Sequence, residues 1–332
     1  IYIMSVKPKS KREQWSGQLG FIFAATGAAI GLGNIWKFPY MVGNDGGSSF
    51  VLVYLFCVLL IGIPIMIAEI LIGRVAQKNP IDALKAIAKD NKKSESWRFI
   101  GWWGMVCLLI TLSFYCVVAG WAVYYLVQAL CGNLQHLSSF ELSKVWTQFL
   151  SSPLLLIKYQ LIFILLTFFV VGLGIHKGIE RVTRILMPVL FIVLIFLVCY
   201  SALNTGQYFK QASHFLFDFR FNQITPAIII DAMGHAFFTL AIGVGAMCAY
   251  GSYLPKKVSI TYSVFVIVTL DVLVAIFSGL AIFPVIFMHG LSISSGPGLM
   301  FESLPIAFSN MDGGRWLESL FFLLLLFAAW AS

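Results

Sequence analysis

Three polar side chains stand inside long apolar stretches of the chain. Asn34 follows a glycine-rich run, Thr239 precedes a second one, and Asp271 lies in the middle of an apolar stretch. A carboxylate inside a membrane is costly and indicates function by default. Hard oxygen ligands of this kind suit a small cation, and a locally unwound helix adds free backbone carbonyls. The alternatives are an interhelical hydrogen bond for Asn34 and a bond from Thr239 to its own helix.

The two glycine-rich runs read GAAIGLG over 27–33 and TLAIGVG over 239–245. Close helix packing explains a single glycine in a membrane helix. It is a weaker explanation for two clusters of glycines, each in the middle of an apolar stretch and beside a polar residue. Unwound backbone at that depth survives only where it lines a cavity or is buried in protein. We therefore expect two broken helices, whose exposed N-termini attract a carboxylate.

The composition indicates an integral membrane protein. Hydrophobic residues make up 60% of the 332-residue chain and charged residues only 11%, with a mean hydropathy of +0.90. A soluble domain carries roughly 25% charged residues. The net charge of +8 is explained by the placement of the basic residues, so we expect no nucleic-acid partner. The six cysteines lie in or beside apolar segments and form no CxxC pair, which favours packing roles.

Eight stretches approach the roughly 20 apolar residues that a membrane span needs. They cover about 19–41, 48–73, 99–131, 154–175, 184–204, 226–254, 259–288 and 315–332. Of the 22 basic residues, 16 lie in 1–18, 74–98, 176–184 and 255–258, which the positive-inside rule assigns to the cytoplasm together with the N-terminus. The polar region 82–97 predicts a short interfacial helix, and 289–312 predicts a long external loop.

The breaks fall in the first and sixth spans. That placement is the one already described for transporters built from two five-span repeats of inverted topology. The predicted fold is therefore an all-α integral membrane domain over 1–332, with a first repeat at about 11–204 and a partial second repeat at about 226–332. Because the chain stops inside an apolar run, we expect the second repeat to lack its last helices.

The run GAAIGLGNIWKFPY over 27–40 resembles the first-helix signature of the neurotransmitter:sodium symporter family, which includes bacterial amino-acid symporters such as the leucine transporter. Three shorter runs support the resemblance: NDGG over 44–47, GIER over 178–181 and FFTL over 237–240. The resemblance implies a sodium-coupled symporter of an amino acid in the plasma membrane, for this chain the inner membrane of a bacterium.

The resemblance also implies two sodium sites. The first would use Ala29, Asn34, Thr239 and Asp271, completed by the substrate carboxylate. The second would use the carbonyls of Gly27, Ile30 and Ala328 with two hydroxyls of the eighth span. At those two positions this chain has Ala331 and Ser332, so the first hydroxyl is absent.

The same resemblance places the substrate. Family members that carry monoamines have an aspartate where this chain has Gly31, so a glycine leaves room for a substrate that brings its own carboxylate. Tyr115 matches the tyrosine that meets this carboxylate; a tyrosine of the membrane core is the alternative. The mostly small and apolar pocket implies a neutral α-amino acid, with these predicted contacts: Ala29, Gly31, Gly33, Thr111, Tyr115, Phe238, Thr239, Ala241, Val244 and Ser332.

Chloride is not expected to be required. Some family members bind chloride near the position of Asp271 through a glutamine and a serine, where this chain has His235 and Ala275. A fixed carboxylate at Asp271 could replace that anion. His235 could titrate, since the ordinary histidine pKa lies near 6.5, although a packing histidine is the alternative. For Glu69, in the second span, we favour a structural role.

Gate residues also follow from the resemblance. At the cytoplasmic side Arg12 and Trp15 resemble an inner gate, with Tyr253 packed nearby, and at the outer side Lys37 replaces the usual arginine. A receptor that binds amino acid without transporting it is the alternative function, which Ala331 favours slightly. An enzyme is excluded because the chain has no HExxH motif, no catalytic carboxylate pair and no Ser/His/Asp set.

Overall fold

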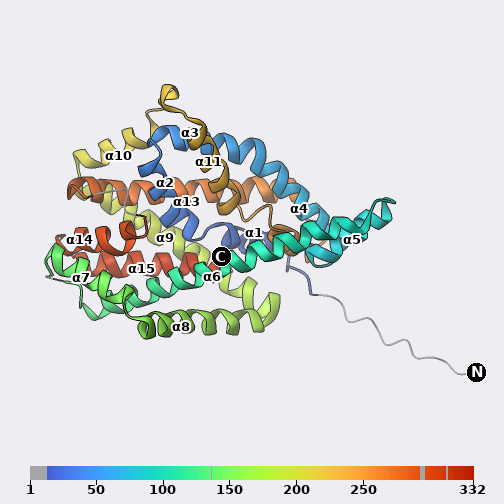
Figure 1. Ribbon diagram of the computed structural model, residues 1–332, viewed down its shortest axis with the longest axis horizontal. Helices are drawn as coiled ribbons and strands as arrows, with labels where there is room; N and C mark the ends of the chain where they lie inside the picture. Colours follow the sequence, from blue (N-terminus) through green and yellow to red (C-terminus); the bar gives the residue numbers. More distant parts are fainter. Residues whose placement is uncertain (1–12, 136, 292–295, 312) are drawn as a thin grey trace, which may run out of the picture.

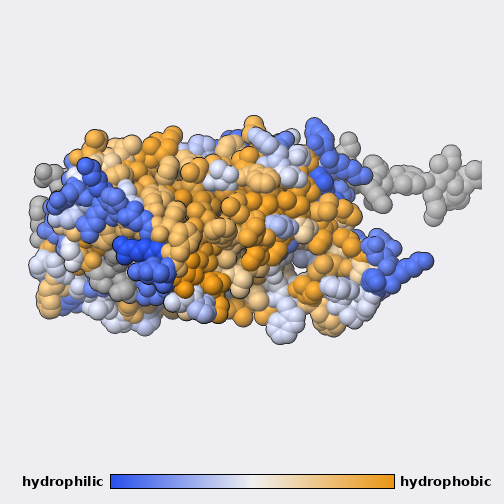
Figure 2. All heavy atoms as spheres, turned by 90° about the horizontal axis from the view of Figure 1, so that it is seen from above, coloured by the Kyte–Doolittle hydropathy of each residue, from blue (hydrophilic) through white to orange (hydrophobic). Residues whose placement is uncertain are grey.

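The computed structural model describes residues 13–135, 137–291, 296–311 and 313–332. Within them the chain is nearly all helical and contains no strand. Most long helices run roughly side by side along the long axis of the molecule (Figure 1). Hydrophobic side chains cover the middle of the face in Figure 2, and hydrophilic ones gather towards its two ends. This distribution is that of a bundle whose middle lies in lipid.

The first helix is broken. α1 (Gln18–Ala29) and the following helix, formed by the π-helical turn η1 (Gly33–Lys37) and α2 (Phe38–Asn44), are bent by 47° across the break. Ile30 adopts extended backbone angles, which end α1. The next span then runs without a break from Ser48 to Ala76 through α3 (Ser48–Cys57), η2 (Val58–Gly62) and α4 (Ile63–Ala76).

The following helices alternate between long spans and short surface elements. α5 (Pro80–Asp90) starts at an Asn79 cap and confirms the short helix predicted in 82–97, two residues earlier than expected. After the turn η3 (Glu95–Trp97) come α6 (Arg98–Cys131), the capped surface helix α7 (Ser139–Leu150), α8 (Pro153–Gly172), η4 (Ile175–Glu180) and α9 (Arg181–Asn204).

The second half begins with α10 (Gln207–Phe217) and η5 (Phe221–Gln223). The predicted sixth span is formed by two helices, α11 (Pro226–Thr239) and α12 (Ala246–Gly251), separated by the non-helical segment 240–245. Next come α13 (Ile260–Met288), the π-helical turn η6 (Leu299–Ser303), α14 (Leu304–Ser309) and α15 (Gly314–Ala331).

Six helices of the described chain are long and apolar enough to cross a membrane, or seven if the bent pair at the first helix counts as one span. The sixth predicted span, 226–254, stays a prediction because α11 has only 14 residues. The prediction of a long external loop over 289–312 is wrong for 299–309, which is helical. That segment is apolar, and Pro305 lies in the first turn of α14, where a proline is well tolerated. As a helix, the segment buries most of its apolar side chains in the protein, which stabilises the helical form.

α13 lies at the centre of the bundle. It contacts α1, η1 and α2 from the first helix as well as α4, α9 and α10. α8 is the opposite case, since only 6% of its apolar window is buried in the protein. The broken first helix is therefore held against α13 in the protein interior, where its unwound backbone has protein partners.

Candidate functional site

The first break is closed by Asn34. Its Oδ1 accepts a hydrogen bond from the Gly31 backbone N–H at 3.1 Å, and its own N–H donates to the Gly31 carbonyl at 3.2 Å. Ser278 on α13 donates to the Asn34 carbonyl at 2.6 Å. The chain leaves the helical path at Ile30 and Gly31, while Asn34 and Ser278 satisfy part of the backbone that this exposes.

The second break uses left-handed backbone. Gly243 and Gly245 have φ values of +82° and +81°, and Ala241 has φ of +50°. Glycine adopts these angles without strain, which explains why the run is glycine-rich. Glu69 on α4 accepts a hydrogen bond from the Gly243 N–H at 2.6 Å. The predicted structural role of Glu69 is consistent with this contact, because it pairs with backbone that no helix satisfies.

Asp271 brings the two breaks together. Asn34 Nδ2 donates to its Oδ1 at 2.8 Å and to its backbone carbonyl at 3.0 Å, and Thr239 Oγ1 donates to Oδ1 at 3.0 Å. Tyr54 OH donates to Oδ2 at 3.2 Å. All four residues are buried, and no basic side chain of the described chain forms an ion pair with Asp271. A buried carboxylate without a basic partner is a good ligand for a cation.

The sequence predicts Asn34, Thr239 and Asp271 at this site, but it does not predict Tyr54 and Ser278. Tyr54 and Ser278 reach the site from the middle of α3 and α13, where a tyrosine or serine in an apolar stretch has many equally good explanations. Only their hydrogen bonds distinguish them from packing residues.

His235 lies beside this cluster with its ring fully buried. Its ring centroid is 5.2 Å from that of Tyr54 and 5.9 Å from those of Phe38 and Phe50. Neither ring nitrogen has a hydrogen-bond partner within the part of the chain that the structure describes. Ala275 is also fully buried, so apolar or aromatic groups surround the Asp271 cluster on this side.

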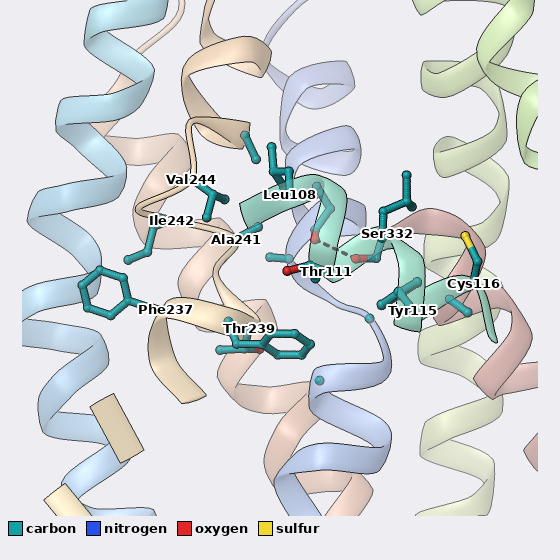
Figure 3. A pocket seen from close by; sticks show the side chains of 18 of the residues that line it. Leu108, Thr111, Tyr115, Cys116, Phe237, Thr239, Ala241, Ile242, Val244 and Ser332 are labelled. Carbon is teal, nitrogen blue, oxygen red and sulfur yellow. Dashed lines mark hydrogen bonds between the residues drawn. The ribbon is translucent and has the colours of Figure 1, made fainter. Parts of the chain in front are cut away.

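A cavity of about 520 Å³ opens between the two breaks, α6 and the end of α15. All ten residues predicted to contact substrate line it. Figure 3 shows Thr111 and Tyr115 of α6 beside Ser332, with Ala241 and Val244 of the second break on another side. The remaining wall is largely apolar, including Leu108, Phe163 and Phe237.

The polar corner of the cavity lies at Gly31. The Leu32 N–H donates to Tyr115 OH at 3.4 Å. A Cβ atom added to Gly31 would lie 2.8 Å from the Ser332 Oγ and 2.9 Å from Tyr115 OH, so any side chain there would fill the corner. Backbone N–H groups at a helix start, together with a hydroxyl, form a suitable receptor for a carboxylate.

The second predicted sodium site lies where α1 meets the end of α15. The Ala331 carbonyl is 3.3 Å from the position of a Cβ on Gly27, and Ser332 Oγ donates to the Ala28 carbonyl at 3.1 Å. The Ala328 carbonyl accepts from the Ser332 N–H at 3.3 Å, and Ile30 is fully buried. The predicted residues are therefore neighbours, but Ala331 contributes no hydroxyl.

The predicted gate residues lie on either side of the cavity. Trp15 is 3% exposed; its N–H donates to the Tyr253 carbonyl at 3.1 Å and its indole to the Tyr250 carbonyl at 2.9 Å. The Trp15 and Tyr253 rings meet edge to face at 6.5 Å. Lys37 Nζ lies 4.3 Å from the centroid of the Phe238 ring. Arg12 lies outside the described residues.

The comparisons with known proteins agree with this geometry. A model of the sodium:neurotransmitter symporter family matches residues 12–148 and 152–332. The chain is 40% identical over 324 residues to the sodium-dependent transporter YhdH of Bacillus subtilis, covering 98% of this chain and 70% of the relative. It is 33% identical to a sodium-dependent transporter of Haemophilus influenzae, covering 96% and 71% of the two chains.

More distant relatives include the sodium- and chloride-dependent taurine transporter of Homo sapiens, which is 27% identical over 95% of this chain and 58% of its own. Among solved structures, MhsT in complex with L-phenylalanine matches with a TM-score of 0.89 and 40% identity, covering 97% of this chain and 72% of MhsT. The match covers the helices that carry both breaks. This chain is thus a multi-pass helical membrane protein and belongs to the sodium:neurotransmitter symporter family, whose members are transporters rather than enzymes.

Proposed function

We propose that this protein transports a neutral α-amino acid together with sodium by alternating access. One observation carries the proposal: the Gly31–Tyr115 corner, suited to a carboxylate, lies on the same cavity wall as the two breaks that Asp271 joins. Relatives at 40% and 33% identity are sodium-dependent transporters, and the MhsT structure contains an amino acid.

The carboxylate of the substrate would bind at the Gly31 and Leu32 backbone and at the Tyr115 hydroxyl. A side chain at position 31 would occupy this space, so the glycine is needed for the substrate and not only for the backbone. The substrate side chain would face the apolar wall, which contains Thr111, Ala241 and Val244. A wall without basic or acidic side chains favours a neutral side chain.

Sodium would bind as a cosubstrate at the Asp271 cluster. Asp271, Asn34 and Thr239 would supply hard oxygens there, and the carbonyl of Ala29, the last residue of α1, would add another. The bound substrate carboxylate would complete the site, which couples the two solutes. A second sodium would bind between α1 and α15 at Gly27, Ile30, Ala328 and Ser332, with one hydroxyl fewer because of Ala331.

We also propose the topology and the gates. The N-terminus would be cytoplasmic in the inner membrane of a bacterium, and the two breaks would belong to inverted repeats at about 11–204 and 226–332. Arg12, Trp15 and Tyr253 would close the inner side, and Lys37 the outer side. The contacts of Trp15 with the Tyr250 and Tyr253 carbonyls support the inner gate, because they join the start of α1 to the end of α12.

Uptake by purified protein in proteoliposomes tests the proposal. We expect accumulation of a radiolabelled amino acid with an inward sodium gradient, and none when potassium replaces sodium. The decarboxylated amine of the same amino acid should not compete. Sodium-dependent binding without uptake would support instead a non-transporting receptor, which the missing hydroxyl at Ala331 favours. Equal binding of amino acid and amine would refute the carboxylate assignment.

A further inference from the structure

Glu318 is a buried acid that the proposed transport site does not use. It lies in the second turn of α15, is fully buried, and is not among the residues that line the cavity between the two breaks. The Gln135 side-chain amide donates to its Oε2 at 3.2 Å. Its Oε1 is buried and has no hydrogen-bond partner among the described residues. An ionised carboxylate in an apolar interior needs several donors or a positive charge, and one amide is not enough.

No basic side chain forms an ion pair with Glu318 within 13–135, 137–291, 296–311 and 313–332. Arg315, one turn earlier on α15, donates instead to the Leu130 carbonyl near the end of α6. The dipole of α15 contributes little, because Glu318 lies beyond the first turn of the helix. The charge of an ionised Glu318 would therefore stay largely uncompensated.

The helices around α15 do not change this balance. α15 packs against α6, α9, α14 and α1, and neither α14 nor α1 carries an ionisable side chain. α9 carries Cys199 and Tyr200 near its end, while its two arginines lie in its first turn. The end of α6 and the turn η6 add phenols, a thiol and a second acid: Tyr124, Tyr125, Cys131 and Glu302. His136 and Asp312 lie outside the described residues.

Tyr125 on α6 is a second buried group without a partner in this region. It is 1% exposed, and its hydroxyl has no hydrogen-bond partner in the part of the chain that the structure describes. Its ring centroid lies 5.2 Å from that of Phe322, which is one turn after Glu318 on the same face of α15. A neutral carboxylic acid both donates and accepts. It can therefore satisfy its own Oε1 and this hydroxyl, directly or through one water.

We infer that Glu318 is a proton-binding site: its carboxyl group holds a proton while α15 is packed against α6, with Tyr125 as a hydrogen-bond partner. The proton comes from water and forms an O–H bond on one carboxyl oxygen, and its release to water leaves a carboxylate. That carboxylate would lack a compensating charge between the helices, so losing the proton should loosen their packing. The same two helices carry Tyr115 and Ser332 of the cavity. The proton site goes beyond the proposed function and does not depend on it.

Infrared spectra of the purified protein test the inference, because a carboxylic acid and a carboxylate absorb at different frequencies. The variants are Glu318→Gln, which keeps the shape of the neutral acid, and the matched control Glu95→Gln, whose side chain is 49% exposed. At neutral pH we expect Glu318→Gln to lose one carboxylic-acid band of the parent, and Glu95→Gln to lose a carboxylate band instead. Tyr125→Phe should keep the acid band but shift it, because the variant removes a hydrogen-bond partner.

Loss of a carboxylate band in Glu318→Gln would overturn the inference. Spectra in sodium and in potassium then show whether the carboxylate binds a cation, which would make Glu318 a cation ligand and not a proton site. An acid band that does not move in Tyr125→Phe would overturn the pairing with Tyr125.

The pH dependence of stability gives a second test. A glutamate exposed in the unfolded chain has an ordinary pKa of about 4.3, so above that pH the folded protein holds one proton more than the unfolded chain. Stability therefore falls as the pH rises, and the unfolding equilibrium constant of the parent should rise roughly tenfold per pH unit relative to that of Glu318→Gln. Glu95→Gln should follow the parent.

A ratio of the parent and Glu318→Gln unfolding constants that stays the same between about pH 6 and about pH 8 would overturn the inference. Neither measurement uses substrate or a sodium gradient. A failure of uptake would therefore count against the proposed function and leave the proton site intact.

Discussion

At the scale of residues, Asp271 is the group whose environment most needs explanation. It accepts hydrogen bonds from side chains on three separate elements, yet none of its neighbours in the described chain brings a positive charge. Hydrogen bonds offset part of the cost of burying a carboxylate, but the net charge remains. A cation bound at this cluster would supply the positive charge that the protein does not.

The substitution Asp271→Asn removes this charge and keeps the shape. Asparagine can still accept from Asn34 and Thr239, so we expect a folded protein. Its apparent sodium affinity should fall roughly tenfold, about 1.4 kcal/mol, because an amide dipole stabilises sodium less than a full charge does. Sodium titrations of substrate binding in both proteins measure the change, with exposed Asp90→Asn as control. Unchanged affinity would place Asp271 outside the ion site.

The substitution Gly31→Ala tests the carboxylate corner. The new methyl group would lie within 3 Å of Ser332 and of the Tyr115 hydroxyl, where substrate oxygens are proposed to bind. We expect substrate affinity to fall by roughly tenfold or more, with little change in unfolding temperature. Gly172→Ala is the matched control, since nothing lies within 4 Å of its added carbon. Equal substrate affinity in parent and Gly31→Ala would remove the carboxylate from this corner.

At the scale of elements, the two breaks are built differently. The first is closed by side chains, since Asn34 and Ser278 pair with its backbone. The second relies on left-handed backbone at Ala241, Gly243 and Gly245, and on Glu69 from α4. The second break is therefore the more sensitive to the loss of a glycine.

We expect Gly243→Ala to destabilise the protein by roughly 1–2 kcal/mol, because an L-residue is strained in left-handed backbone. Its Cβ would also lie 3.0 Å from Phe237. Gly234→Ala is the opposite case on the same chain, since it lies inside α11 with nothing within 4 Å, and should stabilise by up to about 1 kcal/mol. Thermal unfolding in one detergent compares the two; a stabilised Gly243→Ala protein would contradict the left-handed turn.

At the scale of the whole molecule, the charge balance at the Asp271 cluster is the basis for expecting transport without chloride. Fully buried His235 and Ala275 flank the Asp271 cluster, and the carboxylate is part of the chain. A mobile anion beside a fixed carboxylate would be repelled in an interior of low dielectric constant. We therefore propose that the protein itself carries the negative charge that sodium needs through the whole cycle.

Transport should accordingly not need chloride. We expect sodium-driven uptake into proteoliposomes to keep its rate when gluconate replaces chloride on both sides. In Asp271→Asn, added chloride should restore little of the lost sodium affinity, since Ala275 has no polar side chain that could bind the anion. Collapse of uptake by the parent protein in gluconate would refute the charge assignment.

Sequence alone determined the class of the protein and the residue types at its centre. Long apolar stretches in a chain with 11% charged residues can be stable only in a membrane. Two glycine-rich runs beside Asn34 and Thr239 predicted the breaks, because glycine is needed wherever a helix must leave its path. These features are local, so spacing and composition reveal them.

Only the tertiary structure decided which distant residues meet. The contacts of Tyr54 and Ser278 with Asp271 and Asn34, and that of Glu69 with Gly243, join helices far apart in sequence. The sequence also did not predict the helices at 299–309, because a short apolar segment near a glycine-proline turn is compatible with loop and helix alike. Packing against the rest of the protein decides between the two. The physical reason is the same in each case: these choices depend on partners from other helices, and a single stretch of sequence does not contain its partners.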